Sequence, residues 1–268
     1  MSRIRNRFSK LSSEGRKALI PYVTAGDPDP QATVPLLHGL VASGADIIEI
    51  GIPFSDPMAD GPVIQAACER ALAHGVSLND VLRMVREFRR EDDETPLVLM
   101  GYLNPIEAMG ADRFAEAAQD AGVDGVLTVD LPADETDTLL PALRRSGLDP
   151  IFLTAPTTTK ERLQSIASTA SGFIYYVSLK GVTGSSDLDI DDVAHKLAEV
   201  RQYSDLPLGV GFGIATPETA AAVARVADAV VVGSALVRQI AQHASEPDRG
   251  RAEVTRLVAS MRRAMDAA

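Results

Sequence analysis

Short apolar runs alternate with longer amphipathic segments along the whole chain. The apolar runs end in Gly, Pro or Asp, a pattern typical of strands that are buried on both faces and lead into loops. Eight runs of this kind occur in the sequence. The predicted strands are residues 19–24, 47–51, 97–102, 125–129, 150–153, 173–178, 208–211 and 229–233.

The segments between these runs have helical periodicity. Strands that alternate with helices predict a parallel sheet, and eight such units favour a (β/α)8 TIM barrel, here with an extra helix at the N-terminus. The alternative is an open doubly wound sheet, but residues 24–30 lack the glycine-rich dinucleotide turn that follows its first strand. The predicted helices are residues 31–43, 64–74, 78–90, 113–121, 135–146, 161–168, 192–203, 217–226 and 249–267.

Length and composition favour one domain spanning residues 1–268. The chain is 46% hydrophobic, and no linker or composition break divides it. A formal net charge of −11 argues against nucleic acid or an anionic membrane as the main partner. Residues 1–17 nevertheless hold six cations beside Glu14 alone. We interpret this segment as a solvated helix on an acidic body rather than a targeting peptide.

Cysteine and histidine usage limits the chemistry that the chain can support. Cys68 is the only cysteine, so neither a disulfide nor a zinc cluster can form within the chain, and a cytoplasmic location fits. No apolar run reaches 18 residues. The histidines fall in helix-like segments, which weakens metal and histidine-nucleophile mechanisms, and we expect no metal site. These residues are His38, His74, His195 and His243.

Glu49 is the most informative residue of the chain. It lies in the isoleucine-rich strand 47–51, and no Lys or Arg occurs between Ala18 and Glu69. A carboxylate in a buried strand costs several kcal/mol unless it is paired, hydrogen-bonded or protonated. We favour an acid/base group with a raised pKa over a glutamate paired with a distant arginine. Asp60 follows on a loop rich in Pro and Gly.

Three glycine-rich loops follow the last three predicted strands, at residues 181–186, 211–213 and 233–234. Barrel enzymes often hold phosphate with these loops and a helix N-terminus, so backbone N–H groups near Ser234 are candidate anion ligands. Ordinary turn chemistry is the alternative. Large residues at strand ends could line an apolar pocket, or only pack the barrel core. They are Tyr22, Met100, Leu127, Val129, Leu153 and Tyr175.

Residues 49–65 closely resemble the signature of the tryptophan synthase alpha subunit family: EIGIPFSDPMADGPVIQ. The resemblance covers nearly the whole chain. The sequence departs from the family pattern at Tyr22, where phenylalanine is usual, and at Leu179, where the residue is frequently polar. The other segments that carry the resemblance are residues 21–28, 104–105, 130–132, 181–184 and 211–213.

This resemblance implies the family's barrel and its reaction, the reversible retro-aldol cleavage of indole-3-glycerol phosphate to indole and glyceraldehyde 3-phosphate. Glu49 and Asp60 are then the catalytic pair, and residues 181–186 form a lid that brings Thr183 near Asp60. In this scheme Glu49 protonates indole C3 and then accepts the hydroxyl proton, while an ionised Asp60 binds the indole N–H. The remaining predicted substrate contacts are Gly184, Gly211, Phe212, Gly213, Gly233 and Ser234.

The family resemblance also implies a partner. A beta subunit with pyridoxal phosphate would condense the indole with L-serine to give L-tryptophan, in an alpha2beta2 complex, whereas this chain needs no cofactor. Asp56 is the best candidate for an ion pair between the subunits. The other predicted interface residues are Pro53, Pro57, Asn104 and Pro132, although the prolines could only stiffen their loops.

Three other functions stay open at the level of sequence. Lys180 is the only lysine on these loops and is the candidate for a Schiff-base aldolase. A catalytically silent barrel that only activates a partner is the second alternative, which the intact Glu49 and Asp60 disfavour. The third is a stand-alone lyase that releases free indole.

Overall fold

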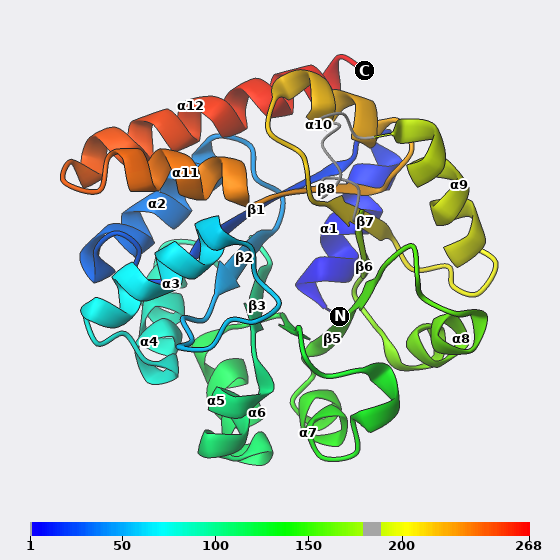
Figure 1. Cartoon of the computed structure of the whole chain (residues 1–268), viewed down its shortest axis with the longest axis horizontal. Coiled ribbons are helices and arrows are strands. Elements are labelled where there is room, and N and C mark those ends of the chain that lie inside the picture. Colours follow the sequence, from blue (N-terminus) through cyan, green and yellow to red (C-terminus); the bar gives the residue numbers. More distant parts are fainter. Residues whose placement is uncertain (1, 179–188) are drawn as a thin grey trace.

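The computed structural model describes residues 2–178 and 189–268. Eight parallel strands form a closed barrel in sequence order, with β8 paired back to β1. Figure 1 looks along the barrel, with the strands at the centre and helices around them. The predicted barrel is confirmed, and no strand end moves by more than one residue. The strands are β1 (Ala18–Thr24), β2 (Ile48–Gly51), β3 (Leu97–Gly101), β4 (Gly125–Thr128), β5 (Asp149–Thr154), β6 (Ile174–Val177), β7 (Leu208–Gly211) and β8 (Ala229–Val232).

Helices surround the barrel on its outer side (Figure 1). They bury apolar faces against the strands, as a parallel sheet covered on both sides requires. The outer helices are α2 (Pro30–Ala42), α3 (Pro62–Ala73), α4 (Leu78–Phe88), α5 (Leu103–Met109), α6 (Ala111–Ala121), the 3-10 helix η1 (Ala133–Glu135), α7 (Leu139–Arg145), α8 (Lys160–Thr169), α9 (Ile190–Val200), α10 (Pro217–Ala224), α11 (Ser234–Gln242) and α12 (Pro247–Asp266).

The helix predictions differ from the structure in three places. Residues 104–105, predicted as a loop, lie in α5, because Pro105 falls in the first turn, where a helix does not need its N–H. The helix predicted at 135–146 is divided into η1 and a shorter α7. The helix start expected at Gly233 and Ser234 continues as α11, a separate helix before α12.

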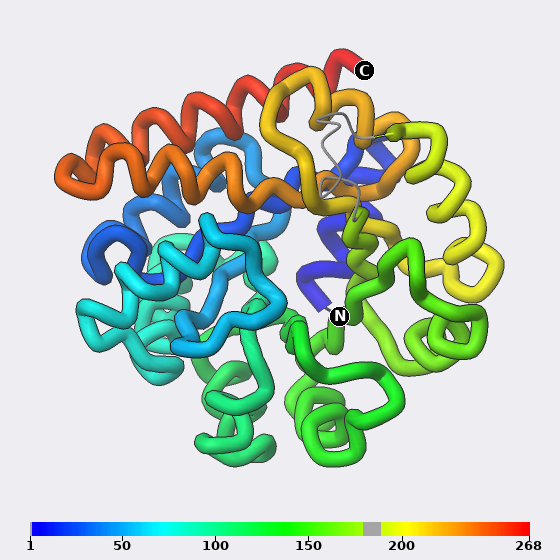
Figure 2. Tube along the Cα trace, viewed as in Figure 1, coloured from blue at the N-terminus to red at the C-terminus, as the bar shows by residue number. Residues whose placement is uncertain are grey.

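The N-terminal helix α1 (Arg3–Ser13) closes one end of the barrel. Its apolar side chains lie three or four residues apart and therefore share one face. Ile4, Phe8 and Leu11 are buried in a cluster with barrel-interior side chains such as Ile20 and Phe173. The tube in Figure 2 shows the start of α1 near the centre of the barrel and the C-terminus at the outer rim of the molecule. The basic helix therefore contributes to the core as well as carrying charge.

Three aspartates join neighbouring strands at the N-terminal end of the barrel. Asp46, just before β2, donates its N–H to the carbonyl of Leu19 at 2.9 Å, and its carboxylate accepts the N–H of Leu19 at 2.9 Å. The same pair of hydrogen bonds recurs before β4 and before β8. The two further pairs are Asp124 with Leu97 and Asp228 with Leu208.

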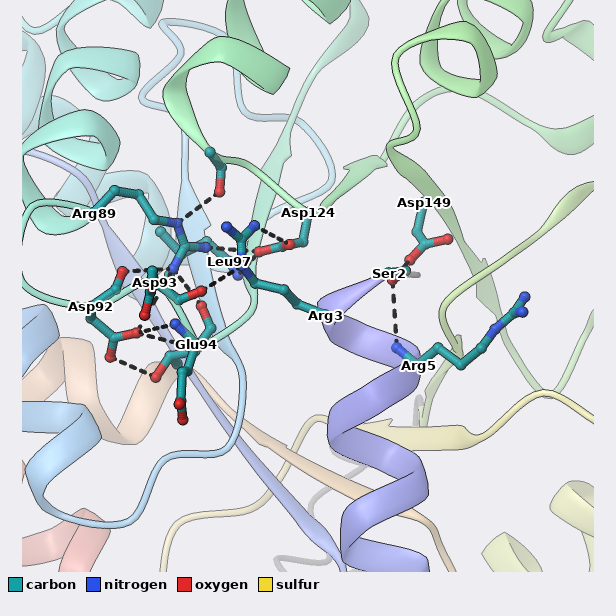
Figure 3. A network of polar contacts seen from close by, with 12 residues as sticks. Ser2, Arg3, Arg5, Arg89, Asp92, Asp93, Glu94, Leu97, Asp124 and Asp149 are labelled. Atoms are coloured by element: carbon teal, nitrogen blue, oxygen red, sulfur yellow. Dashed lines mark hydrogen bonds and ion pairs between the residues drawn. The ribbon is translucent and has the colours of Figure 1, made fainter.

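An arginine from an outer helix or its end neutralises each of these aspartates. Arg262 of α12 lies 3.0 Å from the Asp46 carboxylate, and Arg201 lies 2.8 Å from that of Asp228. Figure 3 shows the third case, in which Arg89 and Arg3 converge on Asp124. Since an unpaired buried charge costs several kcal/mol, these contacts tie the helices to this end of the barrel.

Candidate active site

Most of the candidate residues from the sequence gather at the opposite end of the barrel, where the strands terminate. Glu49 lies in β2, level with Tyr22 of β1 and Val98 of β3. Asp60 lies on the loop between β2 and α3. Active sites of (β/α)8 barrels form on the loops that follow the strands. The structure therefore brings the predicted catalytic pair to the expected end of the barrel.

Glu49 is buried without a partner. The residue is 1% exposed, and neither of its carboxyl oxygens has a hydrogen-bond partner among the described residues. Burial, followed by the charge of Asp60, raises the pKa of Glu49 to about 8. The group therefore carries a proton at neutral pH and can donate it. Within residues 2–178 and 189–268, no arginine pairs with it.

Asp60 has a more polar environment than Glu49. The Tyr102 hydroxyl donates to its Oδ2 at 3.0 Å, and Gln65 Nε2 donates to its backbone carbonyl at 2.9 Å. Burial raises the pKa of Asp60, and the hydrogen bond from Tyr102 opposes that rise. The charge of Asp60 in turn raises the pKa of Glu49, so Asp60 loses its proton first.

Two tyrosine rings each pack over a glycine at the end of the neighbouring strand. A side chain on Gly51 would come within 2.1 Å of the Tyr22 hydroxyl oxygen, and one on Gly211 would come equally close to that of Tyr175. Only glycine leaves room for these rings. The Tyr22 hydroxyl lies 3.2 Å from Thr24 Oγ1. The hydroxyl that distinguishes this chain from the family pattern therefore has a partner and needs none from a ligand.

The apolar residues predicted to line a pocket lie at two depths. Leu127 is 1% exposed and belongs to the barrel-interior cluster. Four partly buried side chains pack against that cluster: Met100, Val129, Leu153 and Tyr175. Leu127 therefore packs in the barrel interior, while the other four side chains lie partly exposed at the ends of their strands.

Two of the predicted phosphate loops lie after β7 and β8. Phe212 and Gly213 follow β7 with positive φ angles of 85° and 77°, and nothing lies within 4 Å of the position that a Gly213 side chain would take. After β8, Gly233 caps α11 without a side-chain hydrogen bond, and Ser234 begins the helix. The N-terminus of α11 can therefore bind an anion. Thr183, Gly184 and the predicted lid at 181–186 lie outside the described residues, as do Leu179 and Lys180.

The predicted interface residues differ in accessibility. Asp56 and Asn104 are exposed, Pro57 and Pro132 are partly exposed, and Pro53 is buried. The sequence does not mark Met58, which is 86% exposed on the same loop as Asp56. A single exposed apolar side chain is common on protein surfaces, so Met58 is a candidate contact only through its place beside Asp56. Its position between Pro57 and Ala59 on a polar loop was the only signal available in the sequence.

Tyr102 is the second residue that the sequence analysis did not assign to the site. It was predicted as the last residue of a strand, and a tyrosine hydroxyl at that end of a barrel was the only hint. The described residues include no group of three or more His, Cys, Asp or Glu side chains placed to hold a metal ion. In the same ranges, no helix is long and apolar enough to cross a membrane.

Comparison with known proteins gives consistent matches over the full chain. A sequence model of the family described as "Tryptophan synthase alpha chain" matches residues 8–266. The tryptophan synthase alpha chain of Thioalkalivibrio sulfidiphilus is 65% identical over 99% of this chain and 100% of its own length, and that of Nitrosococcus oceani is 60% identical over 100% and 98%. Tryptophan synthase subunit alpha from Legionella pneumophila superposes with a TM-score of 0.94 at 49% identity, and each chain is covered completely. An aminoacrylate-bound tryptophan synthase from M. tuberculosis gives 0.86 at 38% identity, covering 97% of this chain and 100% of that one.

The raised pKa of Glu49 predicts how the stability of the protein depends on pH. Folding favours its protonated form, so its contribution to stability is complete below pH 4.5 and is lost as pH rises through about 8. Glu49→Gln cannot ionise, so it should gain stability relative to wild type across this interval, at up to about 1.4 kcal/mol per pH unit. Urea unfolding at about pH 5 and pH 9 would measure the difference in stability between Glu49→Gln and wild type. An equal difference at both pH values would contradict a raised pKa. Glu69→Gln on the exposed surface is the control.

Proposed function

This chain belongs to the tryptophan synthase alpha chain family, and we propose that Glu49 and Asp60 carry out the reaction of that family. The reaction is the cleavage of indole-3-glycerol phosphate to indole and glyceraldehyde 3-phosphate in L-tryptophan biosynthesis. The observation that carries the residue assignment is the protonated Glu49, which has no hydrogen-bond partner among the described residues and lies near a carboxylate that ionises first. Glu49 supplies a proton, and Asp60 supplies a negative charge.

The first step in this proposal is proton transfer from Glu49 to C3 of the indole ring. Protonation at C3 places positive charge on the ring nitrogen, and Asp60 stabilises it by accepting the indole N–H hydrogen bond. The second step uses the carboxylate that Glu49 has become. It removes the proton of the neighbouring side-chain hydroxyl, the carbon–carbon bond breaks, and its electrons return to the ring. Glu49 ends with the proton that it first gave away.

The surroundings of the pair support this assignment. Met100, Val129, Leu153 and Tyr175 form an apolar layer in which a flat indole ring can lie. The backbone at 211–213 and the start of α11 offer N–H groups for the phosphate. Proton transfer by Glu49 and charge stabilisation by Asp60 need no further group, so we infer that this chain uses no cofactor. The roles of Thr183 and Gly184 as lid residues stay predictions.

Family membership implies a beta subunit as partner. We infer an alpha2beta2 complex in which the partner carries pyridoxal phosphate and captures indole, a small apolar product that would otherwise be lost. The loop with Asp56, Pro57 and Met58 supports a docking role, because it pairs an exposed carboxylate with an exposed apolar side chain. A cytoplasmic location and a single domain at 1–268 stay predictions.

Substitution of the two carboxyls tests the catalytic assignment. Glu49→Gln should lower kcat by about a thousandfold or more, since general acid–base catalysis contributes roughly 10²–10⁴. A phosphorylated indole analogue should still bind, because the amide keeps the shape of the side chain. Asp60→Asn should also lose most activity. Indole release under steady-state conditions is the measurement, and substantial turnover by Glu49→Gln would refute the role.

The proposed phosphate site predicts a defect at Gly213. Gly213→Ala should weaken binding of inorganic phosphate and glyceraldehyde 3-phosphate severalfold, because a side chain would block approach to the backbone N–H groups. Gly75→Ala is a matched control. Gly75 has a similar φ of 72° and an equally open side-chain position, but it lies beyond the end of α3. Calorimetric titration measures the binding, and equal affinities for the two variants would remove Gly213 from the site.

The proposed docking loop predicts an effect of charge at Met58. Met58→Glu should weaken association with a beta subunit by about tenfold or more while the isolated chain keeps its own cleavage activity. The exposed Ala252 of α12 provides the control substitution Ala252→Glu. Titration of labelled alpha chain with beta subunit measures both affinities. If both substitutions left the affinity unchanged, the partner would have to dock elsewhere.

A further inference from the structure

The hydroxyl of Tyr102 links two parts of the loop that carries Asp60. Tyr102 follows β3, caps the N-terminus of α5 and is 3% exposed. Its hydroxyl donates to Asp60 Oδ2 at 3.0 Å and accepts the N–H of Ala59 at 2.9 Å. One group on a rigid strand end therefore fixes both the carboxylate and the backbone of the preceding residue.

Neighbouring contacts hold this arrangement in place. The Phe54 ring packs against the Tyr102 ring with centroids 5.2 Å apart. Gln65 Nε2 donates to the carbonyls of Asp60 and Pro57, at 2.9 and 3.3 Å. These contacts fix the ring and the backbone but leave the carboxylate alone. Among the described residues, Tyr102 is the only side chain that hydrogen-bonds to the Asp60 carboxylate.

We propose that Tyr102 is the positioning residue of Asp60: its hydroxyl holds one carboxylate oxygen so that the other faces the indole N–H. The inference rests on the proposed role of Asp60 in cleavage. A carboxylate on an unrestrained loop would sample several orientations, and only one of them would meet the ring nitrogen. Holding that orientation before the substrate binds lowers the cost of reaching the transition state.

The same hydrogen bond favours the ionised form of Asp60. Besides Tyr102, four titratable groups among the described residues lie within electrostatic reach of its carboxylate: Glu49 of β2, Tyr22 of β1, Tyr175 of β6 and Cys68 of α3. None of these four is a cation. Burial raises the pKa of Asp60, and the Tyr102 hydroxyl opposes this rise. Burial also raises the pKa of Tyr102, so the hydroxyl keeps its proton and stays a donor.

The variant Tyr102→Phe tests the inference because it keeps the ring and removes only the hydroxyl. We expect kcat to fall about tenfold or more, and the acidic limb of the pH profile to move up by about one unit as the pKa of Asp60 rises. The basic limb and the affinity for inorganic phosphate should not change. Tyr176→Phe removes another buried tyrosine hydroxyl, on the side of β6 that faces α9, and should leave the acidic limb in place.

A double-mutant cycle separates this inference from the proposed function. If Tyr102 acts through Asp60, Tyr102→Phe should cost little activity in an Asp60→Asn background. Two independent losses that multiply, or an unmoved acidic limb in Tyr102→Phe, would overturn the inference alone. Wild-type activity of Asp60→Asn would overturn the role of Asp60 itself. NMR titration of the Asp60 carboxyl carbon in wild type and in Tyr102→Phe gives the pKa of Asp60 directly. An equal pKa in the two proteins would also overturn the inference.

Discussion

A carboxyl group without a partner in a barrel core must keep its proton, and the site depends on this constraint. Glu49 satisfies it because no cation contacts its carboxyl group among the described residues. Arg70, the first cation after residue 18, donates to Asp27 at 2.6 Å, and Arg262 of α12 pairs with Asp46 at the other end of the barrel. The absence of Lys and Arg between Ala18 and Glu69 therefore has a direct electrostatic result. Within the described residues, no cation lies close enough to the Glu49 carboxyl to lower its pKa.

The molecule separates its stabilising ion pairs from its chemistry. Asp46, Asp124 and Asp228 all act at the N-terminal end of the strands, where each is neutralised by an arginine. The opposite end holds Glu49 in an environment that would be unfavourable for a charge. A buried group with a shifted pKa reduces stability at neutral pH, whereas the ion pairs lie at the far end of the barrel, away from the reacting groups.

The strands could be predicted from the sequence because they are buried on both faces. Val, Ile and Leu runs such as 229–233 have no other plausible place in a chain of this composition, so their ends were predicted within one residue. Pro105 misled the prediction because a proline in a first helical turn resembles a loop residue. The roles of Tyr102 and Met58 depend on which loop lies opposite each side chain, and periodicity carries no information about that. The same holds for Leu127, whose depth in the barrel is set by strand tilt.

The three aspartates join β1 to β2, β3 to β4 and β7 to β8. At the remaining pair, β5 and β6, the start of the chain makes a contact of its own. The carboxylate of Asp149 contacts the hydroxyls of Ser2 and Ser171, while Arg3 reaches Asp124. During synthesis, α1 is made before any strand of the barrel, yet the cluster that buries its apolar face includes Phe173 and Val231, which are made much later. The apolar face of α1 therefore stays incompletely covered until β8 has been translated. Although α1 precedes every strand in the sequence, it is among the last helices that can complete their native contacts.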